Sequence, residues 1–168
     1  MFFQIKTMGT ISILDYQPHH QEWFEQFNRD WIEHYFEMEP VDEFVLTNPE
    51  EALLKPGGAI LMAAYDGVLA GTVALRKVDD VTYEFTKMAV DKNFQRRGIA
   101  EALSYASFKK AKELGAEKVI LYSNSILTPA IRLYEKLGFK HVPIGKGEYK
   151  RSDVKMEIPV SETIPVHI

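Results

Sequence analysis

The sequence predicts an α/β (α+β) fold in which an antiparallel meander of strands is followed by a strand–helix–strand–helix unit. Three observations support this prediction. Stretches with a helical period of three and four residues alternate with short strand-like runs. The turn signals suit hairpins in the middle of the chain and helix ends near the C-terminus. The 168 residues contain no internal repeat and no low-complexity linker. We therefore expect one domain over residues 1–168.

The N-terminal part is expected to hold one strand and two helices. Residues 10–16, TISILDY, read as a strand. Residues 19–36 read as an amphipathic helix, because large aromatic residues recur at steps of three and four. These residues are Trp23, Phe24, Phe27, Trp31 and Tyr35. A second helix is predicted over 48–54, with Asn48 as its N-cap and Pro49 at its first position.

The middle of the chain is expected to form three consecutive strands. Residues 59–78 form a hairpin around Asp66-Gly67, one of the strongest short-range hairpin signals. A turn at Asp79-Asp80 then leads into a third strand, TYEFTKMAV, over residues 82–90. This run predicts the antiparallel meander.

The C-terminal part supplies the strand–helix unit. A helix is predicted over 98–114, ending at Gly115, and is followed by a strand over 117–123. The next helix covers 128–138, with Thr128 as its cap and Gly138 at its end. Residues 139–144 and 152–158 then read as a closing antiparallel pair.

Composition excludes several classes of function. The chain has no cysteine, which excludes disulfides, thiolate zinc sites and a cysteine nucleophile. The net charge of −4 does not support a nucleic-acid partner. No apolar run approaches the ~20 residues of a membrane span, and the N-terminus lacks a signal-peptide pattern. We expect a cytoplasmic protein with no membrane partner.

The histidines do not predict a metal centre. His19 and His20 look like a solvated entry to the first helix, and His141 lies in a predicted strand. No pair of histidines and no carboxylate stands at a ligand spacing. We expect no metal site.

The loop before the 98–114 helix predicts an anion site. Such a loop exposes unpaired backbone N–H groups at the positive end of the helix dipole. Gly98 allows close approach, Ala100 keeps the wall small, and Arg96 and Arg97 add positive charge. A pyrophosphate suits this arrangement. The loop lacks the Lys-Ser/Thr pair of a P-loop and the third glycine of a dinucleotide fingerprint, so an ATP site is disfavoured.

The segment MAVDKNFQRRGIAEAL resembles the acyl-CoA-binding core of the GNAT superfamily of N-acyltransferases, whose signature is Q/R-x-x-G-x-G/A. Gln95, Arg97, Gly98 and Ala100 stand at or within that pattern. Residues 124–140, NSILTPAIRLYEKLGFK, resemble the second hallmark, A-x-x-L-Y-x-K-x-G-F. The resemblance covers residues 59–158 well and 10–58 more loosely. It implies a mixed, mostly antiparallel sheet of about seven strands with about four helices, in which a splayed strand pair binds acetyl-CoA.

The resemblance also implies the cofactor contacts. Backbone amides hold the pyrophosphate, and they come from Gln95, Arg96, Arg97, Gly98, Ile99 and Ala100. The strand end Met88, Ala89 and Val90 pairs with the pantetheine amides, and an amide at Met88 or Val90 polarises the thioester carbonyl. Asn124 contacts the CoA arm, or else is a turn residue. Acetyl-CoA is the co-substrate and no metal is required.

Two residues carry the chemistry that the resemblance implies. Tyr134 donates a hydrogen bond to the leaving thiolate, or else is only a packed aromatic. Glu84 is the base that deprotonates the amine, directly or through water, or else is an edge charge facing solvent. Period-two alternation places Glu84, Thr86, Met88 and Val90 on one face of the strand. Further tyrosines that line the acceptor pocket are drawn from Tyr83, Tyr122 and Tyr149.

The expected function is transfer of the acetyl group of acetyl-CoA to a primary amine of a small molecule or peptide, by direct attack in a ternary complex. The alternative is a non-catalytic acyl-CoA-binding or sensing module. Residues 33–44, EHYFEMEPVDEF, are expected to connect the first two helices and wall the acceptor site. Their acids favour a cationic acceptor, or else form a solvated helix end. These acids are Glu33, Glu37, Glu39, Asp42 and Glu43. A homodimer is left open.

Overall fold

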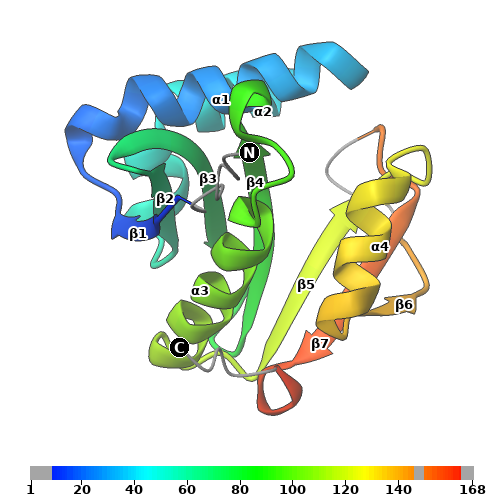
Figure 1. The fold of residues 1–168 in the computed structure, drawn as a ribbon. Coiled ribbons are helices and arrows are strands. Elements are labelled where there is room, and N and C mark those ends of the chain that lie inside the picture. The colour runs from blue at the N-terminus through cyan, green and yellow to red at the C-terminus, as the bar shows by residue number, and fades with distance from the viewer. Residues whose placement is uncertain (1–8, 146–149, 164–168) are drawn as a thin grey trace, which may run out of the picture.

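The computed structural model describes residues 9–145 and 150–163, and these build one seven-stranded sheet (Figure 1). Its order is β1-β2-β3-β4-β5-β7-β6. The strands are β1 (Ile11–Asp15), β2 (Ala59–Tyr65), β3 (Val68–Lys77), β4 (Thr82–Val90), β5 (Lys118–Ser123), β6 (Lys140–Val142) and β7 (Val154–Pro159). All neighbours are antiparallel except β4 and β5, which are parallel. The predicted fold class is confirmed.

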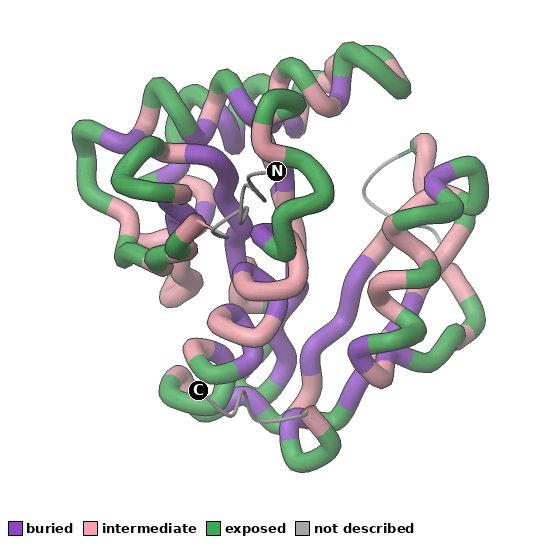
Figure 2. The backbone as a smooth tube through the Cα atoms, viewed as in Figure 1, coloured by how far each residue is buried: buried purple, intermediate pink, exposed green. Residues whose placement is uncertain are grey.

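Two hydrophobic cores lie on opposite faces of the sheet, because strand side chains alternate between faces. The helices are α1 (Gln21–Tyr35), α2 (Pro40–Thr47), α3 (Ile99–Glu113) and α4 (Thr128–Leu137). One core packs α1 and α2 against Ile60, Met62 and Ala74. The other packs α3 and α4 against alternate residues of the same strands, such as Leu61 and Leu75. Figure 2 shows the buried segments running along the central strands, with exposed residues on the outer surfaces of the helices.

The hairpin at Asp66-Gly67 forms as predicted. Both residues have positive φ, 50° and 83°, which is the requirement of a type I′ turn. The turn sets the register of β2 against β3, in which Tyr65 pairs with Val68. β1 then pairs with the outer edge of β2, so the N-terminal strand joins the sheet beside this hairpin.

The second helix is not where the sequence predicted it. α2 spans Pro40–Thr47, Asn48 is its C-terminal cap residue, and Glu50–Leu54 form one π-helical turn, η2. The true start carries the same kind of signal nine residues earlier. Pro40 takes the first position, and the Asp42 carboxylate accepts the backbone N–H of Glu39 at 2.9 Å. Residues 33–44 therefore contain the end of α1 and the start of α2 rather than one connection.

A bulge in β4 changes which residues share a face. Lys87 has φ 53°, and the register with β3 shifts between Thr72 and Ala74. Thr86 pairs with Ala74 and Ala89 pairs with Thr72, on the α1 side of the sheet. Met88 and Val90 pack instead against the α3 core. The prediction that Glu84, Thr86, Met88 and Val90 share one face is wrong, because the extra residue of a bulge resets the alternation.

The parallel pair β4–β5 separates after three residue pairs. Only Thr82, Tyr83 and Glu84 pair with Lys118, Val119 and Ile120. Beyond Glu84 the two strands diverge, as Figure 1 shows between the green and yellow strands. The backbone edge of residues 85–90 that faces β5 therefore has no strand partner in the described sheet.

Candidate functional site

A cavity lies where β4 and β5 diverge. Its walls are residues 84–88 of β4, residues 121–124 at the end of β5, Tyr134 of α4, one side of α1, and the segment Arg151-Ser152. Four residues predicted for the site therefore meet at one place: Glu84, Met88, Asn124 and Tyr134. The predicted pyrophosphate loop and the pair Ala89-Val90 are not among the residues that line this cavity.

Tyr134 enters the cavity from α4. Its ring makes edge-on contacts with Phe85, at 5.8 Å between centroids, and with Phe139, at 6.0 Å. Burial raises the pKa of Tyr134 to about 12. Its hydroxyl has no hydrogen-bond partner among the residues that the structure describes. A phenol in this state stays protonated at neutral pH and has a donor to offer.

Glu84 is a buried residue of β4, with 1% of its surface exposed. Its Oε1 accepts hydrogen bonds from Arg76 on β3, at 2.9 Å from the terminal nitrogen and 3.2 Å from Nε. Arg76 and Glu84 are direct cross-strand partners, which explains the contact. The alternative interpretation of Glu84 as a solvent-facing edge charge is therefore wrong. Glu84 also lines the cavity.

The loop before α3 presents a run of free backbone donors. No backbone N–H from Gln95 to Glu101 donates a hydrogen bond to the rest of the described chain. Arg96 and Gly98 both have positive φ, 62° and 81°, which curls the loop at the helix N-terminus. A Cβ at Gly98 would meet only Ile11, at 3.9 Å, so glycine is favoured here by the backbone angle and not by crowding within the chain. Such a run of amides binds anions.

The side chains of this loop divide between core and surface. Ile99 is buried in the α3 core and anchors the first turn of α3. Arg96 is exposed. The Arg97 guanidinium lies 4.9 Å from the centroid of the Tyr65 ring and 5.4 Å from that of Phe94. The two aromatic rings hold Arg97 beside the free amides, so the loop combines fixed donors with positive charge.

Asn124 has the contacts of a turn residue. Its Nδ2 donates to the backbone carbonyl of Arg151 at 2.5 Å, and its Oδ1 accepts the backbone N–H of Ile126 at 3.0 Å. It thus ties the loop between β5 and α4 to the segment before β7. A contact with the CoA arm stays a prediction.

The acids of residues 33–44 are mostly paired within the chain. Asp42 is fully buried. Its carboxylate oxygens accept hydrogen bonds from Nζ of Lys87 at 2.9 Å and from the two terminal nitrogens of Arg151 at 2.8 and 2.9 Å. Burial acts to raise the pKa of Asp42, but the hydrogen bond from Arg151 and the charge of Lys87 outweigh it, so this pKa lies well below its usual range. Glu39 also pairs with Arg151, at 2.8 Å.

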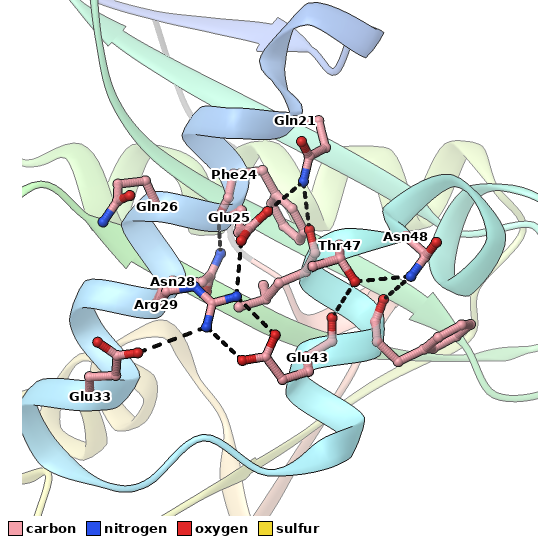
Figure 3. A network of polar contacts seen from close by, with 12 residues as sticks. Gln21, Phe24, Glu25, Gln26, Asn28, Arg29, Glu33, Glu43, Thr47 and Asn48 are labelled. Atoms are coloured by element: carbon pink, nitrogen blue, oxygen red, sulfur yellow. Dashed lines mark hydrogen bonds and ion pairs between the residues drawn. The ribbon is translucent and has the colours of Figure 1, made fainter.

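Glu43 and Glu33 share another cation. Figure 3 shows the Arg29 guanidinium between them, at 2.6 Å from Glu43 and 3.8 Å from Glu33. The neutralising residues lie at positions 29, 87 and 151, outside the acidic segment, which is why the segment looked unpaired in the sequence. The clustered acids are therefore not an open anionic wall, and the alternative of a solvated helix end does not describe Asp42 either.

The predictions for the three tyrosines of the acceptor pocket have different outcomes. Tyr83 is 2% exposed in the α3 core, with its hydroxyl 3.5 Å from the Leu114 carbonyl, so its assignment to the acceptor pocket is wrong. Tyr122 lines the cavity, and Tyr149 lies outside the described residues.

Two predictions about local structure are also wrong. The His20 side chain is not solvated: it is 6% exposed, and its Nδ1 accepts the backbone N–H of Gln17. Thr128 is the first residue of α4 rather than its cap, which is Leu127.

Asn28, Lys87 and Arg151 are among the cavity residues that were not predicted from the sequence. A lysine inside a central strand, next to the apolar run Met88-Ala89-Val90, was the available signal for Lys87. Over residues 9–145 and 150–163, no group of His, Asp and Glu side chains is arranged to hold a metal ion. In the same ranges no helix has the length and apolar character needed to cross a membrane.

Comparison with known proteins places the chain in a family. The model of the Acetyltransferase (GNAT) family matches residues 18–139. The human N-acetylaspartate synthetase is 36% identical over 88 residues, which cover 52% of this chain and 29% of that protein. The uncharacterized N-acetyltransferase YjgM of Escherichia coli K12 is 29% identical over 96 residues, or 55% of this chain and 58% of that one. The chain thus matches less than two-thirds of the length of these relatives.

Solved structures share the fold. A GNAT-family acetyltransferase from Staphylococcus aureus Mu50 superposes with a TM-score of 0.80 at 20% identity, covering 90% of this chain and 99% of that chain. The yncA protein of Salmonella typhimurium, solved with its cofactor acetyl-CoA, gives 0.73 at 19% identity over 90% and 95%. The paiA N-acetyltransferase of Thermoplasma acidophilum, in complex with coenzyme A, gives 0.70 at 19% over 89% and 99%.

The family model covers most of the chain and contains α1 to α4, the bulged strand β4 and the loop of free amides. This chain belongs to the GNAT family of acetyltransferases.

Proposed function

We propose that this protein transfers the acetyl group of acetyl-CoA to a primary amine by direct attack in a ternary complex. The observation that carries the proposal is the cavity between the diverging strands β4 and β5, which both Tyr134 and Glu84 line. A hydrogen-bond donor and a carboxylate on one cavity match the two proton-handling tasks of acyl transfer to an amine. Membership of the GNAT family supports the same reaction class.

The free backbone edges would hold the cofactor. In this proposal the pyrophosphate lies on the amides from Gln95 to Ala100, which have no other acceptor in the described chain. The pantetheine arm runs along Met88, Ala89 and Val90, where β4 has lost its β5 partner. Two structural neighbours were solved with acetyl-CoA or CoA bound, which supports acetyl-CoA as the co-substrate.

The proposed chemistry keeps protons and electrons balanced. The amine, protonated in water with a pKa of about 10, gives one proton to the Glu84 carboxylate, directly or through a water. Its nitrogen lone pair forms a bond to the thioester carbonyl carbon, and a backbone amide of β4 stabilises the oxyanion. When the carbon–sulfur bond breaks, the electron pair goes to sulfur, and the Tyr134 hydroxyl donates to the departing thiolate. The amine loses its second proton to solvent.

The acceptor we propose is an amine that also carries a carboxylate. The acidic segment that suggested a cationic acceptor is mostly neutralised by Arg29, Lys87 and Arg151. Lys87 and Arg151 themselves line the cavity. The relatives named N-acetylaspartate synthetase align with 52–55% of the chain, and their name makes L-aspartate the first acceptor to test.

A thiol-release assay with acetyl-CoA tests the proposal. L-aspartate, spermidine and a peptide with a free N-terminus serve as acceptors, and we expect turnover to be fastest with L-aspartate. Faster turnover with spermidine would overturn the acceptor class and restore the cationic alternative. Tight CoA binding by calorimetry, without turnover of any amine in a broad panel, would overturn the enzyme and favour the sensing module.

A further inference from the structure

Asn28 is a buried polar residue in the middle of α1. It is 1% exposed and lies among the buried side chains Phe24, Phe27 and Ile32. Asparagine is a poor residue for a helix interior, and burying an amide is costly unless its polar atoms are paired. The position therefore calls for a reason beyond packing.

The amide nitrogen of Asn28 is fixed by its own helix. Nδ2 donates to the backbone carbonyl of Phe24 at 2.9 Å, one turn earlier (Figure 3). In an α-helix that carbonyl already accepts the backbone N–H of residue 28, so the side-chain bond supplies no missing partner to the helix. Because a carbonyl accepts and an NH₂ group donates, this contact assigns the orientation of the amide. The side-chain oxygen Oδ1 points elsewhere.

The oxygen of Asn28 opens into the cavity. Among the described residues Oδ1 has no hydrogen-bond partner, yet none of the fully buried side-chain oxygens and nitrogens there is unpaired. Oδ1 must therefore keep some accessible surface. Since Asn28 is almost wholly buried and lines the cavity between β4 and β5, that surface lies in the cavity.

The other polar groups on this side of the sheet suit an amine. Glu84 and Thr86 of β4 line the same cavity, and the pairing of Thr86 with Ala74 places them on the face that α1 covers. An ammonium group has three N–H donors, of which the proposed base takes one. A second needs an acceptor oxygen if the nitrogen is to be held toward the thioester.

We propose that Asn28 orients the acceptor, with Oδ1 accepting a hydrogen bond from the amine that attacks acetyl-CoA. This inference rests on the proposed function. It adds Asn28 as the residue that favours acceptor amines with more than one N–H. Lys87 and Arg151 can only donate hydrogen bonds, so they cannot perform this task.

The test replaces Asn28 by the similarly sized Leu, with Gln26→Leu as the matched control. Gln26 lies on the same helix but is exposed. In Asn28→Leu we expect the KM for L-aspartate to rise about tenfold to a hundredfold, the range of one hydrogen bond to a charged group. The KM for acetyl-CoA should stay within about twofold. Gln26→Leu should match the wild type in both measurements.

A binding experiment on the CoA complex keeps the proposal testable if the variant turns over poorly. By calorimetry, the wild type with CoA should bind L-aspartate at least about tenfold more tightly than its N-trimethyl derivative, which keeps the charge but has no N–H. In Asn28→Leu this difference should become markedly smaller, and what remains is the part that Glu84 and the size of the trimethyl group account for. An unchanged KM in Asn28→Leu, or the same preference in both proteins, overturns the role of Asn28 alone. A wild type that acetylates no amine overturns the proposed function and this inference together.

Discussion

The Tyr134 hydroxyl lies at the cavity without a partner in the described chain, whereas the Tyr83 hydroxyl contacts the Leu114 carbonyl at 3.5 Å. The two residues therefore form a matched pair. Tyr134→Phe should lower kcat by about 10²-fold, the usual size of a lost general acid, and leave CoA affinity unchanged. Steady-state kinetics and calorimetry measure the two effects. Tyr83→Phe should behave as wild type, and equal behaviour of the two variants would reduce Tyr134 to a packing residue.

The high pKa of Tyr134 also predicts a pH profile. Because burial raises this pKa to about 12, the phenol remains protonated throughout the range in which the protein is assayed. Ionisation of Tyr134 should therefore produce no alkaline limb in kcat below about pH 11. An alkaline limb near pH 9 that vanishes in Tyr134→Phe would contradict the assigned state of this residue.

Glu84 carries the base assignment, which the pH dependence of kcat/KM can test. Glu84→Gln should remove the acidic limb of that profile and lower the rate by about 10²-fold. The substitution also removes the Glu84 carboxylate from its contact with Arg76, so a second variant is needed. In Arg76→Gln the Glu84 carboxylate remains but loses a neighbouring cation. The acidic limb of the kcat/KM profile should therefore move to higher pH. An acidic limb that stays in place in both variants would exclude Glu84 as the base.

Among the elements, the loop that begins α3 depends on a left-handed backbone at Gly98. Gly67, in the hairpin turn, has nearly the same φ, 83° against 81°, and a Cβ added there would meet no atom within 4 Å. Alanine at either site should cost about 1–2 kcal/mol of stability, because an L side chain disfavours the left-handed conformation. Only Gly98→Ala should also raise the KM for acetyl-CoA, because its Cβ would stand among the free amides.

Comparing the two glycine variants separates backbone strain from cofactor contact. Urea unfolding gives the stability of each, and the two values should be similar. Calorimetry with CoA gives the second readout, in which Gly67→Ala should match the wild type. Equal CoA affinity in both variants would mean that the loop before α3 does not hold the pyrophosphate.

The bulge at Lys87 shapes β4 as an element. It turns Met88 and Val90 to the α3 side and leaves Glu84 and Thr86 on the α1 side. One strand thereby serves two faces of the sheet, with the proposed cofactor contacts on its backbone edge and the proposed base beside α1. A regular strand would have placed Glu84 and Met88 together.

At the scale of the whole molecule, Asp42 joins three distant segments. It connects α2 to Lys87 in β4 and to Arg151 before β7, and all three contacts lie within 2.9 Å. Asp42→Asn removes a carboxylate from the buried Lys87 and from the partly buried Arg151, and it should lower the free energy of unfolding by about 3 kcal/mol or more. The control is Asp80→Asn, since Asp80 is fully exposed and its contact with Lys77 is 3.7 Å. Urea unfolding at neutral pH should show no measurable loss in the control.

The stability difference between the wild type and Asp42→Asn should also depend on pH. The pKa of Asp42 is lowered in the folded state, so below about pH 4 the unfolded chain binds a proton that the folded chain does not. The stabilisation is therefore complete above that pH and is lost as the pH falls further. The stability gap between wild type and Asp42→Asn should be widest above about pH 5 and narrow below pH 4. A gap independent of pH would contradict the shifted ionisation of Asp42.

The sequence by itself determined the local features of this protein. The Asp66-Gly67 turn, the antiparallel meander, the start of α3 at Gly98 and the helix that carries Tyr134 all depend on residues within a few positions of one another. Short-range patterns report such features because turn angles, helix periods and caps are set by neighbours along the chain. The exception is α2, because two Pro-containing helix starts lie close together in the sequence and the local pattern favours the wrong one.

Only the tertiary structure decided how the site is assembled. The partners of the acidic segment come from positions 29, 87 and 151. The bulge at Lys87 reversed the predicted face of Met88, and Asn28 reaches the cavity from a helix distant in sequence. A register shift, an ion pair and a cavity wall are each fixed by segments that meet only in the folded molecule, because charge and packing act through space and not along the chain.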